Sequence, residues 1–274
     1  MPPTPPSRSS SADPVKGFVS LVGAGPGDPE LMTLKGLRRL RSADVVAYDR
    51  LVNPKLLQEC RADAELVYVG KHGVQPSYPQ EAINALLVQR AQLGHKVVRL
   101  KGGDPFIFGR GGEEALTLRE ANVPFEVIPG VSSAVAAPAY AGIPVTHRHV
   151  AASVAIVAGH EDPAKGASGH NWRALAGVDT LVILMGVGRL EAIAEELIRA
   201  GRAPSTPAAV VRWGTTDEQE TVEGTLETVA ANVRRAGLKA PATLVVGEVV
   251  RLRGELRWFD LDSSAHAAPR RVAR

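Results

Sequence analysis

The sequence contains almost no cysteine. Cys60 is the only one among 274 residues, which excludes a disulfide framework and a metal cluster built on cysteine. An oxidising compartment is therefore not required, and we expect a cytoplasmic protein.

With 45% hydrophobic and 22% charged residues, the composition is that of an ordinary soluble globular protein. The length suits one or two domains of roughly 100–200 residues each.

Long apolar runs are also missing. No stretch reaches the roughly 18 apolar residues that a membrane helix needs, so we expect no membrane partner. The N-terminus has none of the roughly 7–15 consecutive apolar residues of a secretory signal. We expect residues 1–15 to form a disordered leader. Residues 263–274 have no hydrophobic periodicity and carry three arginines, so we expect a frayed basic tail.

Aromatic residues make up only 4% of the chain. A surface that stacks nucleic-acid bases interleaves aromatic with basic residues, and no segment here does so. The net charge of +3 and the pI near 9.1 suit an anionic small molecule equally well. We therefore expect no nucleic-acid partner.

Strands and helices are predicted to alternate along the first half of the chain. Repeated βα units of this kind indicate a mainly parallel sheet covered by helices. Strands are expected at Phe18–Val22, Val45–Tyr48, Glu65–Val69, His95–Leu100 and Phe125–Ile128, and helices at Thr33–Ala43, Pro54–Cys60, Pro79–Leu93 and Glu113–Ala121.

A second α/β set follows the Ala-, Pro- and Gly-rich segment Pro129–Arg148. We predict two unequal α/β domains, residues 16–147 and 148–262. Glu218–Val222 alternates in polarity, which favours an exposed antiparallel strand. The other strands are expected at Ser153–Val157, Thr180–Met185, Ala208–Trp213 and Ala242–Val250, and helices at Arg189–Ala200 and Thr225–Ala236.

Three glycine-containing loops follow predicted strands. The first, Gly23-Ala-Gly-Pro-Gly-Asp28, has Asp28 where the dinucleotide-binding pattern G-x-G-x-x-G needs its last glycine. Asp49 ends the second strand, where a ribose partner would lie. The pattern leaves three readings open: a degenerate NAD site, the loop of a Rossmann-like methyltransferase, or a tight turn before a helix.

The second loop, Lys101–Arg110, runs on into Gly111 and Gly112 and is more informative. Five glycines within eleven residues allow the backbone to approach a ligand closely and to adopt positive φ. Loops at the carboxyl ends of parallel strands are where α/β proteins bind ligands. In the third loop, Ser132 or Ser133 is expected to cap a helix whose free N–H groups could face a ligand.

The sequence offers no catalytic or metal-binding set of a familiar kind. We find no Ser/His/Asp or Cys/His arrangement. His147 and His149 flank Arg148, but zinc needs three or four ligands and no further Cys or His stands at usable spacing. We therefore expect no metal.

The three loops together resemble the tetrapyrrole methylase family. The matching segments occur in the family's order and span roughly Gly17 to Phe259. They are VGAGPGDPELMTLKG at Val22–Gly36, YDRLV at Tyr48–Val52, RLKGGDPFIFGRGGEE at Arg99–Glu114, PGVSSAVAAPAYAGIPVTHR at Pro129–Arg148, TLVILMG at Thr180–Gly186 and PATLVVGEVV at Pro241–Val250.

This resemblance implies a two-domain tetrapyrrole methylase (class III methyltransferase) fold, which is α/β but not Rossmann-like. It implies an active site in the inter-domain cleft, S-adenosyl-L-methionine as methyl donor, S-adenosyl-L-homocysteine as product, and a homodimer. The NAD reading is then set aside. The cofactor-binding residues implied are Pro26, Gly102, Gly103, Asp104, Ile107, Ser132, Ser133, Met185, Trp213, Gly214, Pro241, Ala242 and Thr243.

The substrate implied by the resemblance is uroporphyrinogen III, methylated twice, at C2 and C7, to give precorrin-2 through precorrin-1. Its eight carboxylates call for cations, preferably arginines with their bidentate geometry. Arg110 and Glu113 are the implied catalytic residues, with Glu113 orienting Arg110 or a pyrrole N–H. The substrate-binding residues implied are Asp49, Arg50, Arg110, Glu113, Arg148, His160 and Met185.

The electron-rich pyrrole carbon can attack the methyl group directly, so catalysis should come mostly from orientation. Arg110 is the family's candidate for the base that then removes a proton, but a guanidinium with a pKa above about 12 stays protonated. We therefore expect Arg110 to bind carboxylate and stabilise charge, while water or a substrate carboxylate takes the proton.

Two alternatives remain at this point. A methyltransferase of the same fold could act on a later corrin precursor, or on a non-tetrapyrrole substrate such as the modified histidine of elongation factor 2. A non-catalytic nucleotide-binding module would also explain the glycine loops, but not the arginines within the motifs. Sirohaem, cobalamin and haem d1 are all possible destinations of the product.

Overall fold

The computed structural model describes residues 17–70, 79–160 and 169–259, which form two compact units. Within them, unit 1 holds residues 17–23 and Thr33–Pro129, and unit 2 holds Ala24–Met32 and residues 130–259. The predicted domain boundary between residues 147 and 148 lies inside unit 2, whose second and longer segment begins at Gly130. The predicted leader and tail lie outside the described residues.

Unit 1 contains a five-stranded sheet in the order β3-β2-β4-β1-β5, and every pairing in it is parallel. The predicted mainly parallel sheet is thus confirmed. The strands are β1 (Phe18–Gly23), β2 (Val45–Tyr48), β3 (Glu65–Tyr68), β4 (Lys96–Lys101) and β5 (Phe125–Ile128).

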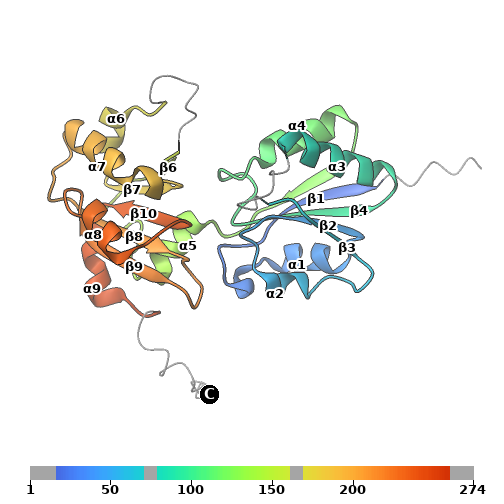
Figure 1. Cartoon of the computed structure of the whole chain (residues 1–274), viewed down its shortest axis with the longest axis horizontal. Helices are drawn as coiled ribbons and strands as arrows, with labels where there is room; N and C mark the ends of the chain where they lie inside the picture. Colours follow the sequence, from blue (N-terminus) through green and yellow to red (C-terminus); the bar gives the residue numbers. More distant parts are fainter. Residues whose placement is uncertain (1–16, 71–78, 161–168, 260–274) are drawn as a thin grey trace, which may run out of the picture. The chain divides into compact units, whose positions relative to one another are not determined.

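Helices cover both faces of this sheet: α3 (Gln80–Gln92) and α4 (Gly111–Glu120) lie on one side, α1 (Leu34–Arg41) and α2 (Pro54–Leu57) on the other (Figure 1). Leu87 of α3 and Leu118 of α4 pack against Leu21 and Val97 of the sheet. Burial of each such aliphatic side chain contributes roughly 1.5–3 kcal/mol. This core fixes the carboxyl ends of β2 and β4, from which the predicted site loops leave.

The sheet of unit 2 has the order β6-β7-β10-β8-β9. β6 and β7 are parallel, and the remaining pairs are antiparallel. β9 is antiparallel, as predicted, but it spans Glu220–Thr225 rather than Glu218–Val222, and most of its residues are partly buried rather than exposed. The strands are β6 (Val154–Ala158), β7 (Thr180–Leu184), β8 (Pro207–Arg212), β9 (Glu220–Thr225) and β10 (Ala242–Val246).

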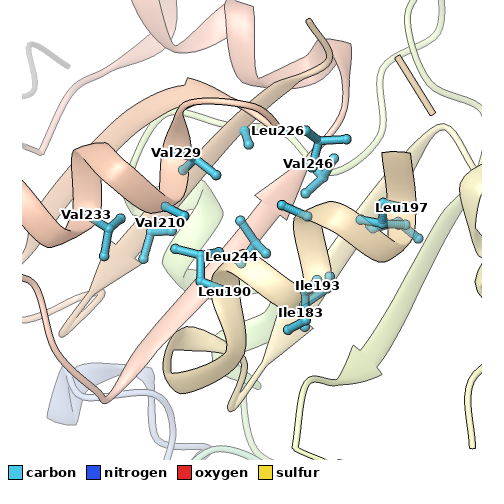
Figure 2. Packing of buried hydrophobic residues seen from close by; sticks show 14 of the residues in the cluster. Ile183, Leu190, Ile193, Leu197, Val210, Leu226, Val229, Val233, Leu244 and Val246 are labelled. Atoms are coloured by element: carbon cyan, nitrogen blue, oxygen red, sulfur yellow. The ribbon is translucent and has the colours of Figure 1, made fainter. Parts of the chain in front are cut away.

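Helices α7 (Leu190–Arg199) and α8 (Val229–Ala236) cover one face of this second sheet. Figure 2 shows their side chains, among them Leu190, Ile193 and Val233, packed with Ile183 and Leu244 of the strands. The alternate strand residues face the other way, where Val211 packs with Ala137 of α5 (Ser133–Tyr140). Both faces are therefore buried. The unit also contains α6 (Trp172–Ala176), α9 (Arg253–Leu256) and the 3₁₀ helices η1 (Pro29–Leu31), η3 (Val187–Arg189) and η4 (Glu248–Leu252).

One predicted strand is too long. The apolar run Ala242–Val250 continues past the end of β10 at Val246, because Gly247 turns the chain at φ 149° into η4. Val249 and Val250 are buried there, so they are as apolar as strand residues.

Among the described residues, no helix is long and apolar enough to cross a membrane.

Candidate active site

The glycine-rich loop of unit 1 begins where β4 ends. Gly103 has a φ of +69°, and the carboxylate of Asp104 accepts hydrogen bonds from the N–H groups of Phe106 (2.8 Å) and Ile107 (3.1 Å). This Asp turn exposes Phe106 and Ile107. The predicted cofactor residues Gly102, Gly103, Asp104 and Ile107 thus belong to one tightly turned segment.

The same loop then folds back on itself before α4. The N–H of Gly111 donates a 3.0 Å hydrogen bond to the carbonyl oxygen of Pro105. A Cβ atom at Gly109 would lie 2.7 Å from that oxygen, and one at Gly111 only 2.5 Å. Both distances are shorter than real Cβ contacts, so only glycine fits at these two positions.

Arg110 lies between these glycines with a φ of 60° and precedes the first turn of α4. Its Nε donates to Oε1 of Glu113 at 2.9 Å, and its Nη2 donates to Oε2 at 2.6 Å. This bidentate bond raises the pKa of Arg110 and lowers that of Glu113. Both side chains are exposed, so the pair presents an oriented, permanently charged guanidinium to solvent.

Asp49 and Arg50 follow the end of β2, next to the end of β4. The N–H of Asp49 donates to the carbonyl oxygen of Leu100 at 3.3 Å, so the two loops start side by side. Arg50 is exposed. The Asp49 carboxylate accepts a 2.6 Å hydrogen bond from Nη2 of Arg99.

Sequence reasoning missed the buried charges beneath this loop. Arg99 and Lys101 of β4 and Glu114 of α4 are 3%, 2% and 0% exposed. Oε1 of Glu114 accepts from Nε of Arg99 at 3.0 Å and from Nζ of Lys101 at 2.9 Å. One sequence signal could have indicated this buried cluster: two charged residues, Arg99 and Lys101, flank Leu100 in a central strand.

The charges in this cluster perturb one another. Burial lowers the pKa of Lys101, and the charge of Arg99 adds to that effect, while Glu114 opposes it. Burial would also lower the pKa of Arg99, but the carboxylates of Asp49 and Glu114 outweigh it and leave that pKa raised.

In unit 2, predicted cofactor residues lie together where the strands of the sheet end, not along an edge strand. β10 runs antiparallel to its neighbours, and Thr243 pairs with Leu184 of β7 and with Val211 of β8. The start of β10 therefore adjoins the ends of β7 and β8. These ends carry Met185, Trp213 and Gly214, beside Pro241, Ala242 and Thr243. The N–H of Trp213 donates to the carbonyl oxygen of Pro241 at 3.3 Å.

His160 leaves the sheet at these same strand ends, because β6 is the parallel neighbour of β7. The backbones approach closely here: a Cβ atom at Gly159 would lie 2.3 Å from Cα of Gly186. His160 and Met185 are both exposed. The structure thus brings together two residues predicted on the substrate side.

Helix α5 begins beside the strand ends. Ser132 is its N-cap, and its hydroxyl accepts a 3.2 Å hydrogen bond from the N–H of Ala134, as predicted for one of the two serines. Ala134 packs against Val182 and Leu184 of β7. Ser132 and Ser133 are therefore held over the sheet that ends in Met185.

The first glycine loop follows β1 of unit 1, but its residues from Ala24 on belong to unit 2. The N–H of Asp28 donates to Oγ1 of Thr215 at 3.0 Å, and a Cβ atom at Gly27 would lie 2.6 Å from Cγ2 of Thr216. Pro26, the predicted cofactor neighbour, is thus held near the turn after β8.

Backbone strain coincides with the predicted site. Outside glycine, the described residues with positive φ are Phe108 (53°), Arg110 (60°), Asn122 (53°), Met185 (57°), Trp213 (46°) and Thr215 (74°). Such conformations cost about 1–3 kcal/mol each and persist where the surroundings enforce them. Three of these six, Arg110, Met185 and Trp213, are among the cofactor and substrate residues that the family resemblance implies.

Arg148 lies on an exposed turn closed by the bridge between His147 and Ala151. The rings of His147 and His149 meet edge to face with centroids 6.1 Å apart. In the described residues, no group of three His, Cys, Asp or Glu side chains gathers as a metal site requires.

Comparison with known proteins adds to this geometry. A sequence model of the family described as Tetrapyrrole (Corrin/Porphyrin) Methylases matches residues 19–230. The uroporphyrinogen-III C-methyltransferase of Bacillus subtilis (strain 168) is 50% identical over 245 residues, which are 89% of this chain and 95% of that protein.

Longer relatives match as well. The siroheme synthase of Acinetobacter baylyi is 53% identical over 89% of this chain, but the chain spans only 53% of that protein. Among solved structures, the uroporphyrin-III C-methyl transferase of Thermus thermophilus complexed with S-adenyl homocysteine is 47% identical, with a TM-score of 0.74. That match covers 86% of this chain and all of the Thermus chain.

Proposed function

The chain belongs to the tetrapyrrole methylase family, and on that premise we propose that it transfers methyl groups from S-adenosyl-L-methionine to uroporphyrinogen III. The observation that carries the proposal is the 50% identity to the Bacillus subtilis enzyme over nearly the full length of both chains. Positive φ values at Arg110, Met185 and Trp213, which lie in motifs of the family, are consistent with it.

The residues present fit the methyl donor. Gly103 has a φ of +69°, and a Cβ atom at Gly102 would lie 3.0 Å from Cβ of Leu51, so the turned loop backbone needs glycine there. Ser132 is the N-cap of α5, whose first N–H groups lie at the helix start. We assign cofactor binding to this loop in unit 1 and to the strand ends with Met185 and Trp213 in unit 2. S-adenosyl-L-methionine supplies an electrophilic methyl group when bound, and no metal is part of the proposal.

Arg110 and Glu113 are the proposed catalytic pair. Glu113 holds the guanidinium through two parallel hydrogen bonds, which fixes the plane that Arg110 offers to a carboxylate of the macrocycle. Arg50, Arg148 and His160 are further exposed groups assigned to the substrate, with Met185 beside them. Orientation of this kind can contribute about 7–11 kcal/mol to catalysis in favourable cases.

Arg110 does not remove the proton that leaves after methyl transfer. Its pairing with Glu113 raises a pKa that is already too high for a base. Glu113, whose pKa is lowered by the same bond, is a poor base for the complementary reason. We assign the proton to water or to a carboxylate of the substrate, and charge stabilisation to Arg110.

The finer parts of the proposal concern the product and the assembly. Two successive methylations, at C2 and C7, would yield precorrin-2 through precorrin-1. We further propose a homodimer that works in the cytoplasm, which size-exclusion chromatography with light scattering and cell fractionation would test.

Incubation of the protein with uroporphyrinogen III and methyl-labelled S-adenosyl-L-methionine, without oxygen, tests the function. We expect a singly labelled product that gives way to a doubly labelled one. Absence of labelled tetrapyrrole would overturn the proposal, and accumulation of the singly labelled product alone would overturn the second methylation.

A further inference from the structure

Four charged residues form a compact cluster beneath the glycine-rich loop of unit 1. We call Asp49, Arg99, Lys101 and Glu114 the β4–α4 charge cluster. Arg99 lies at its centre: Nη2 donates to Asp49 at 2.6 Å and Nε donates to Glu114 at 3.0 Å. Lys101 donates to the same oxygen of Glu114 at 2.9 Å. The two positive and two negative side chains give the cluster no net charge.

Stability alone is a poor reason for such a cluster. Removing charges from water costs several kcal/mol per ion, and a buried ion pair is often replaceable by apolar residues without loss. Glu114 is fully buried, yet its second oxygen, Oε2, has no hydrogen-bond partner within the described part of the chain. An arrangement optimised only for folding would leave no such acceptor.

The cluster instead connects the two ends of the functional loop. Lys101 is the last residue of β4, immediately before Gly102, and Glu114 lies in the first turn of α4, immediately after Glu113. The shared oxygen of Glu114 therefore fixes the start of the loop relative to its end. Through Arg99 the same cluster also fixes Asp49, at the end of the neighbouring strand.

We propose that Arg99, Lys101 and Glu114 are positioning residues that set the loop 102–113 and the Asp49 carboxylate for catalysis. The proposal rests on the proposed function, because the loop carries the residues assigned to the cofactor and the Arg110–Glu113 pair. These three side chains act through the loop and do not touch the substrate.

The test removes one pair without unbalancing charge. The double variant Lys101→Met/Glu114→Gln leaves the Arg99–Asp49 pair intact. The matched control is Arg199→Met/Glu196→Gln, which removes an exposed ion pair of α7 in unit 2. We expect the Kd for S-adenosyl-L-homocysteine and the KM for S-adenosyl-L-methionine to rise about tenfold or more, since a displacement of about 1 Å can cost about 100-fold. The control should change neither.

Amide hydrogen exchange without ligand gives a readout that needs no activity. In the Lys101→Met/Glu114→Gln variant, we expect amides of residues 102–112 to exchange about tenfold faster or more, while β7 amides keep their rates. A purely structural role would reduce the folded fraction but leave KM and Kd of the folded protein unchanged. Should this variant fail to fold, Glu114→Asp keeps the charge but shortens the reach, and the same increases are expected.

Unchanged KM, Kd and loop exchange in a folded variant would overturn the positioning role. Failure of the proposed function looks different: the unaltered protein would then methylate no uroporphyrinogen III, whatever the exchange rates of the variants.

Discussion

The hydroxyl of Tyr140 donates a 2.9 Å hydrogen bond to Oδ2 of Asp28, across 112 residues of sequence. The other carboxylate oxygen of Asp28 accepts from the N–H of Glu30, and its own N–H donates to Thr215. The loop that resembles a dinucleotide-binding turn is thus bound to the end of α5 and to the turn after β8. Asp28, the residue that breaks the dinucleotide pattern, makes all of these contacts.

We predict that Tyr140→Phe lowers the free energy of unfolding by about 1–2 kcal/mol, because it deprives a carboxylate of a half-buried donor. Burial and the nearby Asp28 raise the pKa of Tyr140 to about 12. This contribution is therefore complete below pH about 10 and is lost as the pH rises through about 12. Urea denaturation at pH 7 and in alkaline buffer would measure it.

A double-mutant cycle with Asp28→Ala, which removes the acceptor, isolates the bond itself. We expect a coupling free energy between the two substitutions, since the residues are in direct contact. Additive effects within about 0.5 kcal/mol would contradict the assignment of the stability to this hydrogen bond.

Gly214→Ala is predicted to damage unit 2 and to weaken cofactor binding. A Cβ atom at Gly214 would lie 2.4 Å from Cβ of Ala137 in α5. Overpacking of this kind costs about 1–3 kcal/mol, and the backbone must shift between Trp213 and the helix that Ser132 caps. Calorimetry with S-adenosyl-L-homocysteine and thermal denaturation would record both effects.

Gly188→Ala is the matched control, because a Cβ atom there meets nothing within 4 Å. Ala137→Gly added to Gly214→Ala should restore binding only in part, because a Cβ atom at residue 214 would still lie 2.8 Å from Cα of residue 137. Equal affinity of Gly214→Ala and the unaltered protein would show that α5 and the β8 end need not be in close contact for binding.

Much of the fold follows from local signals in the sequence. Ser132 caps α5 because its hydroxyl satisfies a free N–H, and Gly201 ends α7 at a φ of 103°, which suits glycine. The loop after β4 stands out in the sequence because five glycines lie within eleven residues directly after a predicted strand. These features need only neighbouring residues, so a pattern can reveal them.

The missed features depend on distant partners. In the sequence, Arg99 is an ordinary polar residue of a strand. Nothing near it shows that its guanidinium donates a hydrogen bond to Asp49, 50 residues away. The contacts of Asp28 with Tyr140 and Thr215 span even more of the sequence, 112 and 187 residues. The hydrophobic periodicity of a sequence shows which face of a helix or strand is apolar. It does not show which buried charged side chains pair with one another.

A pH-dependent contribution to stability is predicted at Glu126 in β5. Burial alone would raise its pKa, but hydrogen bonds from Arg39, Lys35 and Ser20 outweigh this and lower the pKa to about 2. Because the folded pKa is depressed, the stabilisation is present above the unfolded value near pH 4.3 and is lost as the pH falls toward about 2.

Glu126→Gln should therefore be less stable than the unaltered protein at pH 7, and the difference should shrink between pH about 4.3 and 2. Guanidinium denaturation across this range would measure the difference. A gap that stays constant down to pH 2 would mean that the ion pairs of Glu126 contribute nothing and that only side-chain packing differs.

Arg110→Lys is predicted to keep the charge and lose most of the methyl transfer. The observed contact uses Nε and Nη2 of Arg110 against the two oxygens of Glu113, a planar geometry that an ammonium cannot reproduce. Because exposed ion pairs contribute little to folding, we expect a thermal transition close to that of the unaltered protein. Turnover with uroporphyrinogen III should fall about 100-fold, by analogy with the loss of one transition-state donor.

Arg61→Lys provides the control, since Arg61 makes the same kind of exposed bidentate pair with Asp63, at 2.9 and 2.5 Å, away from the loop. Its turnover should stay at the level of the unaltered protein. Glu113→Gln separates the two parts of the explanation: it keeps the Arg110 guanidinium but removes the anion that orients it. If orientation matters, this variant loses turnover although Arg110 is intact. Near-normal turnover in Arg110→Lys would instead show that positive charge at this position suffices and that bidentate recognition is not how the loop acts on its substrate.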